Sequence, residues 1–152
     1  MNKRTRPMVL FCMLLAVVAS ATAETVTYTG SATAAVSKLM LPLGNGGSVV
    51  TAANHGIAAI STSPPSLLQM NCLGLGLLGA DNGYATDFYC TFAADENDSF
   101  DVKGVDGPEG GTATVIGGSG KWKDATGSGT FKRVSSTESS SSITFEIKVT
   151  TP

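Results

Sequence analysis

The feature that most constrains the fold is the spread of glycine and turn-forming residues along the chain. The sequence holds 18 glycines, from Gly30 to Gly129, and no stretch after residue 23 combines helical periodicity with good helix formers over three turns. Short segments rich in β-branched and aromatic residues alternate with turn signals instead. This pattern predicts an all-β fold, a single antiparallel β-barrel of about eight strands, with a β-sandwich as the alternative.

The predicted strands are short and are separated by recognisable turns. A Gly44-Asn45-Gly46-Gly47 turn, an acidic loop at 94–98, a turn-rich connection at 106–111 and a flexible serine-rich loop at 135–142 divide the chain. The first predicted strand covers 24–29, and 32–36 is either its continuation or a separate strand. The other predicted strands cover 39–43, 48–53, 56–61, a central pair within 67–92, and then 100–105, 112–116, 129–134 and 143–149.

The central segment predicts a long hairpin that is pinned by a disulfide. With a three-residue loop at 80–82, Cys72 lies directly opposite Cys90, so a Cys72–Cys90 disulfide fits the register without a bulge. On the cysteine face Gly74 would lie across from Phe88, where an aromatic ring can cover a glycine. Two buried free thiols are the alternative, and exported thiols tend to be oxidised.

The first 23 residues predict a cleavable signal peptide. Lys3, Arg4 and Arg6 form a positive region, an apolar run covers 8–19, and Ala21-Thr22-Ala23 has the small-x-small pattern of a cleavage site. The apolar run is shorter than the roughly 20 residues that span a bilayer, which disfavours a permanent anchor. We therefore expect cleavage after Ala23, a single β-barrel domain at 24–152, no membrane span after cleavage, and a secreted or periplasmic location.

Cleavage would make the remaining chain acidic. Without the three basic residues of the signal peptide, seven basic residues face twelve acidic ones, a formal net charge of −5. This charge argues against nucleic acid or an anionic membrane as a partner.

Three local motifs have alternatives that do not involve a cofactor or a metal. Gly74-Leu75-Gly76-Leu77-Leu78-Gly79 has the spacing of a dinucleotide-binding loop, but Asp81-Asn82-Gly83 follows where that motif needs a helix, so we expect no cofactor. The acidic run at 95–101 lacks the glycine and glutamate of an EF-hand and is better interpreted as a solvated turn. His55 is the single histidine, so no metal site with several histidines can form.

Asp87 is the carboxylate of most interest because it lies within a predicted strand. If its face lines a barrel lumen together with Tyr89, the two are speculative catalytic residues, with Asp87 as a desolvated acid or base. If that face points outward, Asp87 is an ordinary surface residue, and strands normally send aspartate to solvent.

The segment 114–131, which contains Gly117-Gly118-Ser119-Gly120-Lys121-Trp122, resembles the C-terminal hairpin of allene oxide cyclase-like and dirigent-like barrels. Similar hairpins occur in exported bacterial proteins, so a bacterial exported member is the expectation. The resemblance implies a calycin-like eight-stranded barrel with an apolar cavity, often in a homo-oligomer, and transfers no catalytic set. The glycines would permit a tight corner and Trp122 could plug the barrel end. The implied structural turn comprises Gly117, Gly118, Gly120, Trp122, Gly127 and Gly129.

Three functions fit these features. The first is an exported barrel that binds a small apolar ligand or a protein partner without catalysis. The second is a cyclase or dirigent-type enzyme acting on an oxidised lipid or a phenolic substrate. The third is a structural or adhesive surface protein. An apolar cavity favours the first, an inward-facing acid the second, and a lumen packed with side chains the third.

Overall fold

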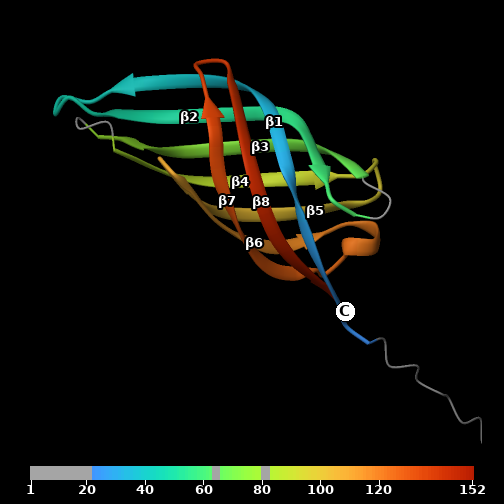
Figure 1. Ribbon diagram of the computed structural model, residues 1–152. Helices are drawn as coiled ribbons and strands as arrows, with labels where there is room; N and C mark the ends of the chain where they lie inside the picture. Colours follow the sequence, from blue (N-terminus) through green and yellow to red (C-terminus); the bar gives the residue numbers. More distant parts are fainter. Residues whose placement is uncertain (1–21, 63–65, 80–82) are drawn as a thin grey trace, which may run out of the picture.

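The computed structural model describes residues 22–62, 66–79 and 83–152. Eight antiparallel strands form a closed barrel in chain order, and the last strand returns to pair with the first (Figure 1). The predicted all-β barrel is therefore confirmed. The elements are β1 Glu24–Pro42, β2 Ser48–Ile60, β3 Ser66–Leu78, β4 Tyr84–Ala93, β5 Ser99–Gly107, β6 Gly110–Gly118, the 3₁₀ helix η1 Gly120–Trp122, β7 Thr126–Ser136 and β8 Ser140–Thr151.

Side chains alternate between the lumen and the outer wall along each strand, as the pleat requires. In β1, for example, Ala32 and Ala34 are buried while Ser31 and Thr33 are exposed. The buried core is apolar throughout, with Phe100, Val102 and Val149 as the largest fully buried side chains. Burial of one face of every strand is what fixes the register of the sheet.

The strands are staggered around the barrel, which gives the sheet its tilt. Following paired residues from Met40 on β1 through β2 to β8 leads back to β1 at Gly30, a shift of ten residues from 40 to 30. Strand number, stagger and tilt together set the width of a barrel interior. A closed sheet of this kind leaves room for a cavity and has no free edge.

Some strands are longer than the sequence predicts. β1 is one strand of 19 residues, so the continuation of 24–29 into 32–36 is correct, whereas the break before 39–43 is wrong, as is the division of β2 into 48–53 and 56–61. The predicted flexible loop at 135–142 is too long, because β7 extends to Ser136 and β8 begins at Ser140, which leaves 137–139 between the two strands. Backbone pairing with neighbouring strands outweighs the weak β-propensity of glycine and serine.

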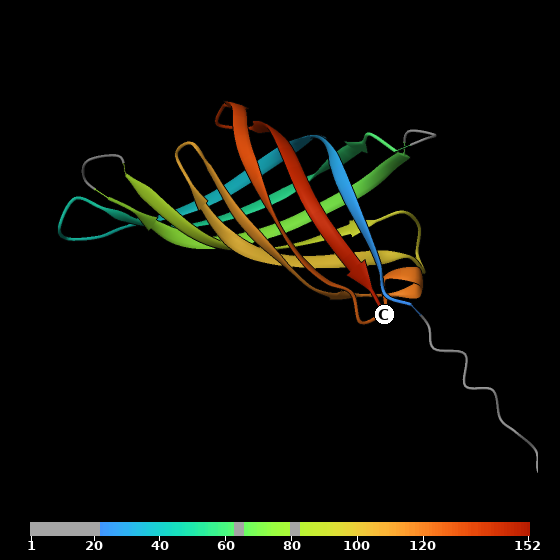
Figure 2. The same cartoon turned by 60° about the horizontal axis from the view of Figure 1, so that its bottom comes forward.

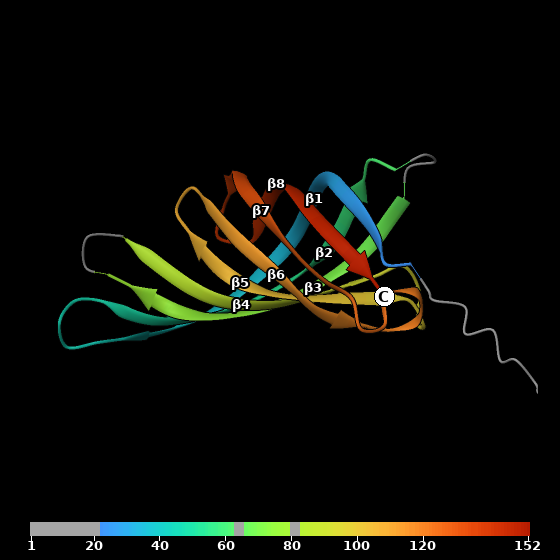
Figure 3. The same ribbon diagram turned by 90° about the horizontal axis from the view of Figure 1, so that it is seen from below.

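The two ends of the barrel differ. Figure 2 shows β1 and β8 meeting beside η1 at one end, and Figure 3 shows the β1–β2 hairpin projecting past the β5–β6 and β7–β8 turns at the other. The predicted signal peptide lies outside the described residues except for its last two positions. Within 22–62, 66–79 and 83–152, no helix has the length and apolarity to cross a membrane.

Candidate functional site

The lumen contains a cavity of about 280 Å³. Its wall is formed mostly by aliphatic and aromatic side chains, with a few polar groups near the projecting end. The apolar lining includes Val36, Met40, Met70, Phe88, Phe92, Phe131, Ile143 and Phe145. An apolar concavity with a small number of convergent polar groups is the usual form of a small-molecule site.

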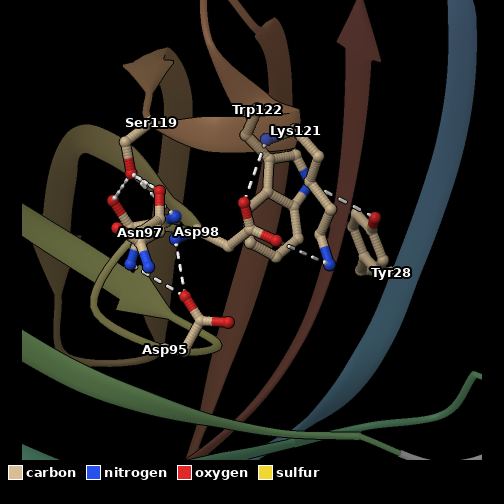
Figure 4. A network of polar contacts seen from close by, with 8 residues as sticks. Tyr28, Asp95, Asn97, Asp98, Ser119, Lys121 and Trp122 are labelled. Carbon is tan, nitrogen blue, oxygen red and sulfur yellow. Dashed lines mark hydrogen bonds and ion pairs between the residues drawn. The ribbon is translucent and has the colours of Figure 1, made fainter.

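Aromatic rings fill the opposite end of the lumen. Trp122 is buried and packs edge-on against Phe100, with ring centroids 5.2 Å apart. Its indole Nε1 donates to the Tyr28 hydroxyl at 3.4 Å (Figure 4). Phe100 in turn stacks on Phe92, with centroids 5.1 Å apart. These rings fill the lumen at the η1 end, whereas the cavity lining extends to Lys38, Met40 and Leu78 near the projecting hairpins.

The acidic β4–β5 loop holds η1 in place. Asp98 Oδ1 accepts a hydrogen bond from the Lys121 backbone nitrogen at 3.1 Å, and its Oδ2 lies 3.7 Å from Lys121 Nζ (Figure 4). Ser119 Oγ donates to the Asn97 carbonyl at 2.6 Å. A Cβ on Gly120, whose φ is +55°, would lie 1.8 Å from Asp98 Oδ1, so only glycine fits this contact.

The remaining glycines of the predicted structural turn are closely surrounded or have unusual backbone angles. Gly117 and Gly127 have φ values of +141° and +154°. A Cβ on Gly118 would lie 2.2 Å from the Ser99 carbonyl oxygen, and one on Gly129 would lie 2.4 Å from that of Glu146. The segment therefore acts as a compact corner between β6 and β7.

The acidic loop itself forms a turn. Asp95 Oδ1 accepts backbone hydrogen bonds from Asn97 at 2.8 Å and Asp98 at 2.9 Å. These two bonds lower the pKa of Asp95 below its ordinary value. No cluster of three metal-ligating side chains occurs in the described part of the chain.

Three polar side chains meet in the open part of the lumen. Arg133 Nη2 and Asp106 Oδ2 form an ion pair, and the two side chains are 19% and 23% exposed. The Arg133 guanidinium lies 5.6 Å from the ring centroid of Tyr84, whose hydroxyl donates to the Gly107 carbonyl at 2.6 Å. We call Tyr84, Asp106 and Arg133 the polar rim.

The local sequence explains why these three side chains face inward. Tyr84 shares the inner face of β4 with Phe88 and Cys90, and Asp106 shares that of β5 with Val102. Arg133 directly precedes a bulge, since Arg133 pairs with Ile143 but Ser135 pairs with Ser142. A bulge redirects neighbouring side chains and is frequent beside functional sites.

The polar rim has hydrogen-bonding capacity that the protein leaves unused. Asp106 Oδ1 and Arg133 Nε are buried and have no hydrogen-bond partner among the described residues. Arg133 Nη1 makes one long contact, 3.4 Å to Ser141 Oγ. Unsatisfied buried polar atoms are costly, so a hydrogen bond from a ligand or a water molecule to either atom would be favourable.

Burial raises the pKa of Tyr84 above its ordinary value of 10.0, and the nearby Asp106 charge raises it further, whereas Arg133 lowers it. The folded protein therefore retains this proton at a pH where the unfolded chain has lost it. The stabilisation is present below pH 10 and is lost as the pH rises from 10 through the folded pKa.

We expect Tyr84→Phe to lose less stability than the wild type between about pH 9 and pH 11, because it lacks the titrating group. Urea denaturation at several pH values measures how steeply the free energy of unfolding falls as the pH rises. Tyr89→Phe, on the exposed outer wall, is the matched control for the loss of one tyrosine hydroxyl. If the free energy of unfolding falls equally steeply with pH in Tyr84→Phe and in the wild type, Tyr84 is not the group responsible.

The Cys72–Cys90 disulfide is present, and its register agrees with the predicted hairpin. Both cysteines line the cavity. Gly74 lies opposite Phe88, as predicted, but the phenyl ring covers a different glycine. A Cβ on Gly104 of β5 would lie 2.7 Å from Phe88 Cζ, whereas the nearest Phe88 atom to a Cβ on Gly74 would be Cβ, at 3.8 Å. The ring leans across the neighbouring strand, so Gly104 provides its space.

Asp87 and Tyr89 lie on the outer wall and are exposed, with Tyr89 at 59%. The inward-facing alternative for these two residues is therefore wrong, and neither reaches the lumen. They neighbour exposed Leu73, Leu75 and Leu77 of β3. His55 is also outward, with its Nδ1 2.8 Å from Asn71 Oδ1. Gly74 and Gly76 of the nucleotide-like motif lie within β3, which continues to Leu78.

No family model and no curated protein matches the chain. Solved structures match its fold. The pterocarpan synthase dirigent protein GePTS1 is 14% identical, with a TM-score of 0.57 over 84% of this chain and 90% of that one. The pterocarpan synthase dirigent protein PsPTS1 is also 14% identical, with a TM-score of 0.53 over 84% and 94%. The predicted dirigent-like barrel is thus confirmed as a fold.

Proposed function

We propose that the barrel binds a small, largely apolar molecule in its lumen and holds a polar group of that molecule at the polar rim. The observation that carries this proposal is the single concavity in which an apolar wall and the Tyr84, Asp106 and Arg133 side chains converge. Its volume of about 280 Å³ lies near the lower end of typical ligand pockets. The dirigent proteins of similar fold support a barrel whose lumen takes a ligand or substrate.

The chemistry of the rim defines the polar group of the ligand. Asp106 Oδ1 can accept a hydrogen bond and Arg133 Nε can donate one, so a hydroxyl group, which does both, satisfies the pair. Phe88 and Phe131, whose rings meet edge-on at 5.5 Å, line the wall next to this position. A compact hydroxylated apolar molecule therefore matches the site.

We propose that this binding takes place outside the cytosol. The disulfide supports an oxidising compartment, and the predicted signal peptide at 1–23 supports export.

The second candidate is a cyclase or dirigent-type activity on an oxidised lipid or a phenolic substrate. It is favoured by Tyr84, a proton donor whose raised pKa keeps it neutral, beside an acid and a cation in the same cavity. Oxidising a phenol with an added oxidant in the presence of the protein tests it. An excess of one enantiomer among the coupling products supports the activity, and a racemic product excludes it for that phenol.

Ala52→Phe tests the binding proposal because Ala52 lines the cavity and a phenyl ring would occupy it. We expect calorimetric titration with decanol to show binding to the wild type and at least about a tenfold weaker affinity for Ala52→Phe. Ala53→Phe is the matched control, since Ala53 is the next residue on β2 and faces outward opposite Leu73. Equal affinities for the two variants would contradict the proposal.

A further inference from the structure

The charges in the lumen do not balance. The charged side chains that line the cavity are Lys38, Asp106 and Arg133. Asp106 and Arg133 neutralise one another as an ion pair. Lys38 has no ion-pair partner in the described ranges 22–62, 66–79 and 83–152. The cavity therefore carries a net charge of +1, although the whole chain has a formal net charge of −2.

Lys38 is at an unusual position for a lysine. It continues the inner face of β1 that begins with Ala32, Ala34 and Val36, all of which line the cavity. Lys38 is exposed, but it lines the cavity, whereas the lysines in the other strands, Lys103, Lys132 and Lys148, are exposed on the outer wall. A cationic side chain on the lining of an apolar concavity raises the local concentration of anions there.

Asn54 provides a neutral hydrogen-bond donor close to this charge. It lies on β2 opposite Val36, and Lys38 pairs with Ala52, so the two side chains are diagonal neighbours on the inner face. Asn54 is half-buried and lines the cavity, and its amide makes no hydrogen bond with another described residue. An ammonium and an amide NH₂ are a suitable donor pair for a carboxylate.

We propose that Lys38 and Asn54 form a second polar subsite, which binds the carboxylate of an amphipathic organic acid whose apolar body fills the lumen. This inference rests on the proposed ligand binding and specifies its ligand class. The polar rim lies on β4, β5 and β7, whereas Lys38 and Asn54 lie on β1 and β2. A hydroxylated organic acid can therefore bridge the two subsites across the apolar middle of the cavity.

Three decyl compounds with different head groups separate this proposal from simple apolar binding. We expect calorimetric titration of the wild type at neutral pH to show decanoate binding about fivefold more tightly than decanol, with decylamine weakest. Lys38→Met should remove the preference for decanoate over decanol and leave the decanol affinity within about a factor of two. Higher salt should reduce the preference in the wild type, because Lys38 is exposed and salt screens its attraction for the carboxylate.

Lys103→Met is the matched control, because it removes the same charge from the outer wall. Lys103→Met should keep the fivefold preference for decanoate over decanol. This result would show that the net charge of the protein alone does not cause the preference. Equal affinities of the wild type for decanoate and decanol, or an unchanged preference in Lys38→Met, would overturn the subsite. Failure of all three compounds to bind would overturn the proposed function as well, so the two failures are distinguishable.

Discussion

Replacing Trp122 with alanine is expected to lower the free energy of unfolding by about 3–5 kcal/mol. The indole is 4% exposed and packs against Phe100 at 5.2 Å, so its removal leaves a cavity that the stiff barrel end cannot fill. The Tyr28 hydroxyl also loses its donor. The aromatic end of the barrel is thus expected to be sensitive to a single truncation.

Urea denaturation followed by far-UV circular dichroism measures this effect, because Trp122 is the single tryptophan and its fluorescence is lost in the variant. Trp122→Phe keeps an aromatic ring in place and should lose clearly less stability than Trp122→Ala. Lys123→Ala, at the exposed neighbouring position, should stay within about 0.5 kcal/mol of the wild type. If Trp122→Ala lowers the free energy of unfolding by less than about 1 kcal/mol, Trp122 does not stabilise the barrel end as proposed.

Removing the disulfide is expected to have the second largest effect. The Cys72→Ala, Cys90→Ala double variant should be about 3 kcal/mol less stable than the oxidised wild type, because the cross-link closes a loop of 18 residues in the unfolded chain. The β3–β4 register should persist, since it is also fixed by burial of Met70 and Phe92 on the inner face.

Dithiothreitol supplies the internal control for this prediction. Reduction should lower the stability of the wild type to that of the double variant and leave the double variant unchanged. If the reduced wild type unfolds at the same urea concentration as the oxidised protein, the disulfide does not stabilise the fold.

The central hairpin shows what the sequence could predict. Cys72 and Cys90 pair as expected because the turn length and the two-residue alternation of side chains leave one register that joins both thiols without a bulge. The acidic loop could also be predicted, since Asp95 makes the local backbone bonds that favour aspartate in turns. Local rules suffice where the partners are close in sequence.

The polar rim was missed because its members come from distant strands. Asp106 lies in a segment that was interpreted as a turn, and Arg133 lies at the end of a predicted strand, 27 residues later. Asp106 and Arg133 come together only because β5 pairs with β6 and β6 with β7. The bulge after Arg133 lies in the pairing of β7 with β8. The sequence does contain one signal for Tyr84. Tyr84 and Cys90 are an even number of residues apart on one strand, so their side chains lie on the same face of the sheet.

The position of Asp87 illustrates the limit of such alternation. A strand pattern separates the two faces but does not state which face is the lumen when both are apolar, and here Leu73, Leu75 and Leu77 occupy the outer one. The packed interior selects the face with Met70, Phe88 and Phe92 because these larger rings and chains fill the staggered barrel.

Native mass spectrometry of the protein purified from its own host tests the central claim most directly, because it assumes no ligand in advance. The account predicts a small molecule bound at one per barrel in the wild type and in Ala53→Phe, and its absence in Ala52→Phe. A wild-type protein that carries no small molecule, and that also fails to bind decanol in solution, would contradict it.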